Sequence, residues 1–141
     1  MEIEEKKLGR VFGIKFSQGE NFLAGLSEFA REREIKEASL FVFGAMNEGR
    51  MITGFRSAEG YDVSRRSLGS KREFVAYGTL TWPEEKPLAI EDPEPWDGPQ
   101  PYAHLHMTVG PPVGEEQSEV LAGHLSKAIA LAIFVDVYEL L

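Results

Sequence analysis

The stretch Tyr102-Ala-His-Leu-His-Met107 contains two of the three histidines of this chain, His104 and His106. Side chains of a β-strand alternate between its two faces, so a His-x-His pair in a strand places both imidazoles on the same face. Apolar residues occupy the alternate positions, and the pattern continues to Val109. These residues therefore predict a strand that has one histidine face and one apolar face.

The third histidine, His124, lies in Gly123-His-Leu125. If the fold brings it beside His104 and His106, three imidazoles would form a ligand set that catalytic zinc sites use with one position left open. The preceding glycine permits a close backbone approach at this point. The alternative explanations are a buried core histidine with satisfied hydrogen bonds and a pair of surface histidines that share no ion.

Other residues bear on the same candidate site. The chain contains no cysteine, so only imidazole and carboxylate ligands are available, and imidazole also suits copper, nickel or iron. Asp136 is a candidate fourth ligand or a residue that orients a histidine. An outward-facing acid on a strand is the commoner explanation for Asp136.

Length and charge limit the class of protein. The chain has 141 residues, a formal net charge of −8 and a pI near 4.9. This is the size of one domain, and the acidic balance opposes direct DNA binding, because phosphate contacts require lysine and arginine. No apolar run reaches the ~18 residues of a membrane helix, and residues 1–7 lack the apolar core of a signal peptide. We expect one domain over residues 1–141, located in the cytoplasm and not associated with a membrane.

One amphipathic helix stands out. Apolar residues from Phe22 to Ala30 recur at helical spacing, and the helix is expected to end near Ile35. Ser17 and Glu20 have the spacing of a capping box before it. This helix is expected to bury its apolar face against a sheet.

Strand patterns occupy much of the remaining chain. The expected strands are 11–16, 38–44, 51–55, 61–68, 74–82, 103–109 and 133–138. The apolar run 38–44 suits a strand buried on both faces, and Asn47-Glu-Gly49 predicts a hairpin that joins it to 51–55. A helix over 118–132 competes with a strand. The predicted fold is α/β (α+β), a mainly antiparallel six- to seven-stranded sheet with one or two flanking helices.

Residues 83–101 form a Pro-rich acidic loop insertion. They hold six of the eight prolines of the chain, together with six acidic residues. Proline removes backbone donors and fixes φ, so neither a helix nor a central strand is expected here. A long loop in a small domain often covers a functional site, although an exposed tether is an equal alternative.

Basic residues cluster in the middle of the chain. They are Arg50, Arg56, Arg65, Arg66, Lys71 and Arg72. On neighbouring strands they could bind a small anionic ligand or an acidic loop of a partner protein. Charged outer faces of strands are the commoner explanation.

Several motifs, taken in order, resemble the PPC (plants and prokaryotes conserved) domain family. The matching residues are Gly19-Glu-Asn-Phe22, Phe43-Gly-Ala-Met46, Glu73-Phe-Val-Ala-Tyr-Gly-Thr-Leu80, His104-Leu-His106 and Gly123-His-Leu125. The resemblance extends from about Arg10 onward. It implies a homotrimer in which His104, His106 and His124 bind a metal, with zinc as the expected ion.

The chain departs from this family pattern in two places. Ala122 stands where the family usually has the first glycine of Gly-Gly-His-Leu, and the 83–101 insertion is longer than the usual turn. The Arg-Gly-Arg-Pro motif of AT-hooks, which plant members use to contact DNA, is absent.

Three functions follow as hypotheses. The first is a zinc-binding, homotrimeric PPC-like domain that acts as a binding or assembly module. The second is a metal-dependent hydrolase acting on a small substrate, because a three-histidine metal with an open position lowers the pKa of bound water. The third is a DNA-associated regulatory protein, which the net charge and the missing AT-hook oppose.

Overall fold

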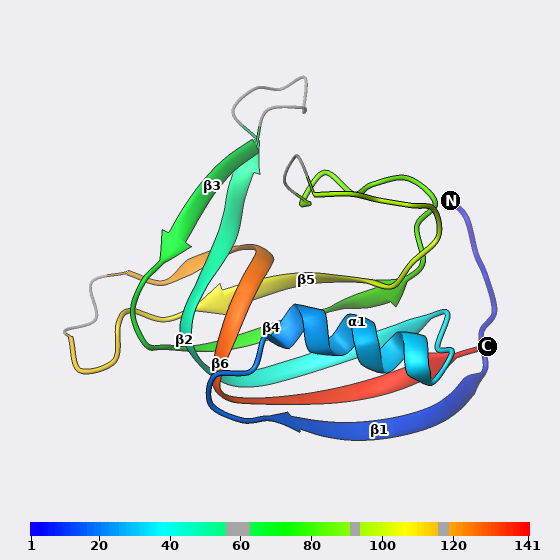
Figure 1. The fold of residues 1–141 in the computed structure, drawn as a ribbon, viewed down its shortest axis with the longest axis horizontal. Helices are drawn as coiled ribbons and strands as arrows, with labels where there is room; N and C mark the ends of the chain where they lie inside the picture. The colour runs from blue at the N-terminus through cyan, green and yellow to red at the C-terminus, as the bar shows by residue number, and fades with distance from the viewer. Residues whose placement is uncertain (56–62, 91–93, 116–118) are drawn as a thin grey trace.

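The structure is a computed structural model that describes residues 1–55, 63–90, 94–115 and 119–141. One helix and six strands occur in these ranges (Figure 1). In chain order they are β1 (Leu8–Phe16), α1 (Phe22–Glu32), β2 (Ala38–Phe55), β3 (Val63–Leu68), β4 (Arg72–Thr81), β5 (Tyr102–Val109) and β6 (Leu121–Leu140). The expected strands 11–16, 74–82 and 103–109 are confirmed as β1, β4 and β5.

The six strands form one antiparallel sheet in the order β1-β6-β5-β4-β2-β3, and β6 also pairs with β2. This additional pairing closes β6, β5, β4 and β2 into a ring, while β1 and β3 are attached outside it. Figure 1 shows β2 and β6 bending strongly as they pass from one part of the sheet to another. The predicted mainly antiparallel sheet is confirmed.

The expected hairpin between 38–44 and 51–55 is wrong, because β2 is one strand of 18 residues. It pairs with β6 from Ala38 to Ile52, and the register shifts on both sides of Met46. The Asn47 side-chain amide donates to the carbonyl of Ala130 at 3.1 Å. The residues that resemble a turn therefore occupy a bulge, where an extra residue bends a strand without ending it.

The competing helix over 118–132 is also wrong, although residue 118 itself lies outside the described residues. Residues 121–140 form the single strand β6, which is longer than the expected strand 133–138. Its first part pairs with β5 and then with β2, so these ladders satisfy backbone groups that a helix would satisfy internally. Tertiary pairing overrides the helical preference of the alanines and leucines.

Helix α1 begins one residue after its N-cap, Asn21, whose side-chain oxygen accepts from the backbone N–H of Ala24 at 3.2 Å. Ser17 is therefore not the N-cap of the helix, although its backbone N–H donates to the Glu20 carboxylate, which is one of the two bonds of the predicted capping box. The helix ends at Glu32, three residues before Ile35. No helix in the described ranges has the length and apolar character that crossing a bilayer requires.

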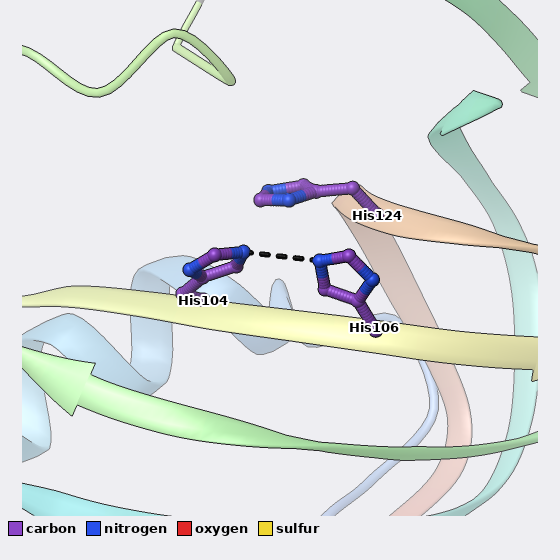
Figure 2. A group of neighbouring side chains, drawn as sticks. All are labelled: His104, His106 and His124. Carbon is purple, nitrogen blue, oxygen red and sulfur yellow. Dashed lines mark hydrogen bonds between the residues drawn. The ribbon is translucent and has the colours of Figure 1, made fainter. Parts of the chain in front are cut away.

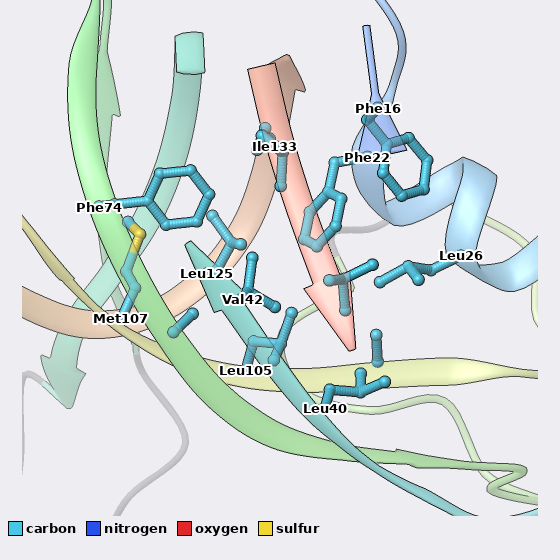
Figure 3. Close-up of a cluster of buried hydrophobic side chains, with 14 of the residues drawn as sticks. Phe16, Phe22, Leu26, Leu40, Val42, Phe74, Leu105, Met107, Leu125 and Ile133 are labelled. Atoms are coloured by element: carbon cyan, nitrogen blue, oxygen red, sulfur yellow. The ribbon is translucent and has the colours of Figure 1, made fainter. Parts of the chain in front are cut away.

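The core lies between α1 and the inner face of the ring (Figure 3). Phe16 and Phe22 meet edge to face with ring centroids 5.1 Å apart. On β2, Leu40 is buried, but the neighbouring residues Phe41 and Phe43 are 50% and 58% exposed. The expectation that 38–44 is buried on both faces is thus not met within a single chain, and an apolar surface lies on the outside of the sheet.

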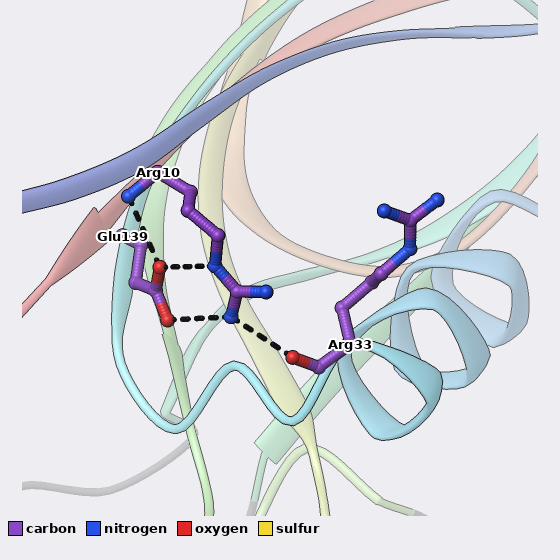
Figure 4. A network of polar contacts seen from close by, with 3 residues as sticks. All are labelled: Arg10, Arg33 and Glu139. Carbon is purple, nitrogen blue, oxygen red and sulfur yellow. Dashed lines mark hydrogen bonds and ion pairs between the residues drawn. The ribbon is translucent and has the colours of Figure 1, made fainter.

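An ion pair joins the two ends of the chain (Figure 4). The Arg10 guanidinium donates to both carboxylate oxygens of Glu139, at 2.7 and 2.8 Å, and to the carbonyl of Arg33 at 2.9 Å. The Arg10 side chain and its backbone N–H lower the pKa of the buried Glu139 carboxyl to about 2. This contact ties β1 to β6 and to the end of α1.

We expect Glu139→Gln to destabilise the protein by about 1–2 kcal/mol at neutral pH, because charge-assisted hydrogen bonds are lost around a half-exposed arginine. The folded-state pKa lies below the ordinary value of 4.5, so this stabilisation is present above pH 4.5 and disappears as the pH falls toward 2. Urea unfolding across this range measures both effects.

Glu119→Gln is the matched control, because Glu119 pairs with Arg66 where both side chains are about 40% exposed. This control is expected to change stability by less than about 1 kcal/mol. Equal effects of the two substitutions would contradict the assigned role of Glu139.

Candidate metal centre

The outer face of β5 carries Tyr102, His104, His106 and Thr108. The alternate residues, such as Leu105, are buried in the core. Both histidines are exposed, and they project from the same face of the strand. The predicted division of this strand into a histidine face and an apolar face is confirmed.

The third histidine arrives from β6, where His124 pairs directly with His106 of β5. One ligand nitrogen from each of the three residues lies within 4.8 Å of the others. The Nε2 atoms of His104 and His106 are 3.1 Å apart, and the rings of His104 and His124 have centroids 4.7 Å apart. Figure 2 shows the three rings next to one another, with the His124 ring above those of His104 and His106.

Two glycines allow the backbone to place these histidines. A Cβ on Gly78 would lie 1.8 Å from the carbonyl oxygen of His104, and one on Gly123 would lie 2.4 Å from that of Ile52. Real Cβ atoms do not approach so closely, so only glycine permits these strands to pack at the observed distance. The predicted close approach before His124 is therefore present.

The donor set suits a divalent transition metal. Zinc–nitrogen distances of about 2.0–2.1 Å place neighbouring tetrahedral ligands roughly 3.3 Å apart, which is close to the observed separation of His104 and His106. Neutral imidazoles are the form that binds metal. Asp136 is not part of the cluster; it pairs with Gly13 and Phe41 farther along β6.

Burial and neighbouring charges favour the neutral form of two of these imidazoles, those of His104 and His124. Burial, together with His104, His106 and Arg65, lowers the pKa of His124 to about 4. Partial desolvation of the ring and the nearby His106 also lower the pKa of His104, although this side chain is largely exposed. These two residues can therefore bind a cation readily, because neutral imidazoles offer lone pairs that protons do not occupy.

Tyr102 also belongs to the site, although no role was predicted for it from the sequence. Its hydroxyl lies 3.0 Å from Nε2 of His124, and burial raises its pKa to about 12. The hydroxyl thus stays protonated at neutral pH and can act as a donor. The signal that could have identified Tyr102 is its position two residues before His104 on the same strand face.

A cavity of about 720 Å³ opens beside the histidines. Pro87, Leu88 and Ala89 of the 83–101 segment form one wall. Arg65 of β3 holds this wall by donating to the carbonyls of Leu88 and Ala89, each at 3.2 Å. The described parts of 83–101 contain neither helix nor strand, as expected, and they flank the site rather than extending away from it.

The basic residues in the middle of the chain lie in different surroundings. Arg66 pairs with Glu119, and the buried Arg72 donates to the carbonyl of Gly110. Arg50 lines a second cavity of about 480 Å³ between α1 and the 83–101 segment. Arg56 lies outside the described residues.

Comparison with known proteins agrees with this architecture. The family model of the Plants and Prokaryotes Conserved (PCC) domain matches residues 3–140. A solved metal-containing protein from Archaeoglobus fulgidus shares 20% identity at a TM-score of 0.78, covering 99% of this chain and 86% of that one. A solved PPC protein from Pyrococcus horikoshii also shares 20% sequence identity, with a TM-score of 0.78. The match covers 100% of this chain and 85% of that one.

A third solved structure, of a candidate DNA-binding protein from Bacteroides thetaiotaomicron, shares 20% identity at a TM-score of 0.67. It covers 95% of this chain and 82% of that chain. No curated protein matches the chain. At these identities the solved structures support the fold and leave the chemistry of the site to be argued from its own residues.

The lowered pKa of His124 predicts how the stability of chelator-treated protein depends on pH. Between pH 6.5 and about 4 the unfolded chain binds a proton at His124 that the folded chain does not. Stability should therefore fall as the pH falls through this window, and His124→Gln should reduce that dependence. Urea unfolding at several pH values measures the slope, and identical slopes for both proteins would show that His124 is not buried as described.

Proposed function

Because the chain belongs to the PPC domain family, abbreviated PCC in the matching model, we propose that it is a cytoplasmic, metal-binding module that assembles as a homotrimer. The resemblance based on the histidine motifs is thereby confirmed at the level of the family. Its role is to hold a zinc-type ion at His104, His106 and His124 near a boundary between subunits.

One observation carries the metal proposal, namely the convergence of three ligand nitrogens within 4.8 Å. His104 and His106 come from one strand and His124 from another, so the fold rather than local sequence brings them together. A bound zinc-type ion would supply a Lewis-acidic position for an anion or a water molecule. The solved relative from Archaeoglobus fulgidus, described as metal-containing, supports this proposal.

An exposed apolar surface supports self-association. We define the outer apolar patch by five residues whose side chains are 37–58% exposed: Phe41, Phe43, Val75, Tyr77 and Phe134. Large exposed apolar surfaces commonly mark protein–protein contacts. His106 pairs with Tyr77, and both residues line a groove that also includes Phe41, Phe43 and Val75. The proposed metal site therefore borders the proposed contact.

Hydrolase and DNA-binding functions have weaker support. Among the described residues that line the histidine cavity there is no carboxylate to act as a general base. The solved relative from Bacteroides thetaiotaomicron is named as a candidate DNA-binding protein, but the present chain has a formal charge of −8. Binding of this chain to a DNA duplex at physiological salt, weakening as salt is added, would favour the DNA function.

We expect purified protein to contain about one metal ion per chain, and His106→Ala to lose most of it, because two imidazoles bind more weakly than three. Elemental analysis of protein purified without added metal measures the content and identifies the ion. Thr108→Ala is the control, since Thr108 lies two residues farther along the same strand face. Equal metal content in the wild type and His106→Ala would overturn the proposed site.

Light scattering is expected to give a mass three times that of the 15.7 kDa chain. Val75→Asp should shift it toward the monomer, because burying an unpaired carboxylate in an apolar contact is costly. Val113→Asp is the matched control, since Val113 is similarly exposed but lies outside the outer apolar patch. A monomeric wild type at micromolar concentration would contradict the proposal.

A further inference from the structure

We propose that the cavity beside the histidines binds an amphipathic monocarboxylate, with its carboxylate at the histidine cluster and its apolar chain along Leu88. This inference rests on the proposed function, because the bound metal contributes to holding the carboxylate. It goes further by specifying the chemical class of the ligand, which has an anionic head and an unbranched or aromatic apolar body.

The cavity has a polar end and an apolar wall. The polar end consists of the three histidines and Tyr102, with Thr53 nearby. The apolar lining is made by Ile52, Pro87, Leu88, Ala89, Ala122 and Gly123. A volume of about 720 Å³ is in the range of small-molecule sites, which combine an apolar lining with a few convergent polar groups.

Leu88 is an exposed apolar residue in the lining of the cavity, and an apolar ligand would cover it. It is 57% exposed, and it lies in a segment that otherwise consists largely of prolines and acids. Its backbone carbonyl is held by Arg65, so the side chain is presented on an anchored wall. An anchored apolar wall favours binding, because less conformational entropy is lost when a ligand docks.

Tyr102 indicates where the head of the ligand lies. Its hydroxyl is within hydrogen-bonding distance of Nε2 of His124. If that nitrogen coordinates the metal, its lone pair no longer accepts a hydrogen bond, and the half-buried hydroxyl needs another acceptor. A carboxylate oxygen at the histidine cluster would supply it, since hydroxyl donors form strong bonds to anions.

The charges around the cavity favour an anionic head. The described lining residues include no carboxylate, although the chain as a whole carries a formal charge of −8. The guanidinium of Arg65 donates to the carbonyls of Leu88 and Ala89, so a positive charge lies at the wall of the cavity. A divalent cation on three neutral histidines would add further positive charge, which a monocarboxylate partly neutralises.

The test is isothermal titration calorimetry of the zinc-loaded full-length chain with butanoate, hexanoate and octanoate, with octanol as the probe that lacks the anionic head. Affinity is expected to increase up to about four-fold for each methylene buried. Octanol should bind more weakly than octanoate. Zinc content is measured on the same samples before titration.

Two variants test separately how the apolar chain and the carboxylate of the ligand are bound. Leu88→Ser should flatten the dependence on chain length and leave zinc content unchanged, because only a side chain of the wall is lost. Its matched control is Leu8→Ser, since Leu8 is 62% exposed and belongs to β1. Tyr102→Phe should weaken all three carboxylates by about ten-fold, without changing the dependence on chain length.

The outcomes distinguish this inference from the proposed function. Retained zinc with equal affinities for butanoate and octanoate would overturn the amphipathic ligand while leaving the metal module intact. A chain that cannot be loaded with zinc would overturn the metal module, and carboxylate binding that still strengthened with chain length would show that the apolar wall acts without the ion. Octanol binding as tight as octanoate would overturn the assignment of an anionic head.

Discussion

The antiparallel pairing of β2 with β6 is the contact on which the rest of the structure depends. It runs from Ala38 opposite Glu139 to Ile52 opposite His124. Strand β2 also pairs with β4, strand β6 also pairs with β5, and β4 and β5 pair with each other. The β2–β6 ladder therefore closes the ring and encloses the core beneath α1. The same register brings the start of β6 alongside β5, so His124 meets His106. The convergence of the histidines is thus a consequence of the ring closure.

The local features of the site could be predicted from the sequence. A period of two over Tyr102–Val109 is sufficient to place His104 and His106 on one face, because alternation is a property of every strand. Helix α1 could be predicted for a similar reason, since Phe22, Leu26 and Ala30 have helical spacing and are buried as that spacing requires. In each case the relevant interaction lies within a few residues along the chain.

The long strands could not be predicted in this way. Met46 and Asn47 occupy a bulge, and residues of this kind are equally compatible with a turn until the partner strand is known. The small residues Ala128 and Ala130 are buried in β6, where they permit close packing, although alone they favour a helix. The hydrogen bond of Tyr102 to His124 likewise depends on two strands meeting, so no local pattern could reveal it.

The outer face of the sheet connects the proposed metal site with the proposed assembly. Along β4, Val75 and Tyr77 belong to the outer apolar patch, while their partners on β5 are Thr108 and His106. A second copy that covered the patch would therefore reach the edge of the histidine cluster. On the proposed function, any effect of association on the position of His106 would change metal affinity, and metal binding would change association by the same free energy. The alternation of side chains along β5 thus divides one strand between the core and a surface that borders both the proposed metal site and the proposed subunit contact.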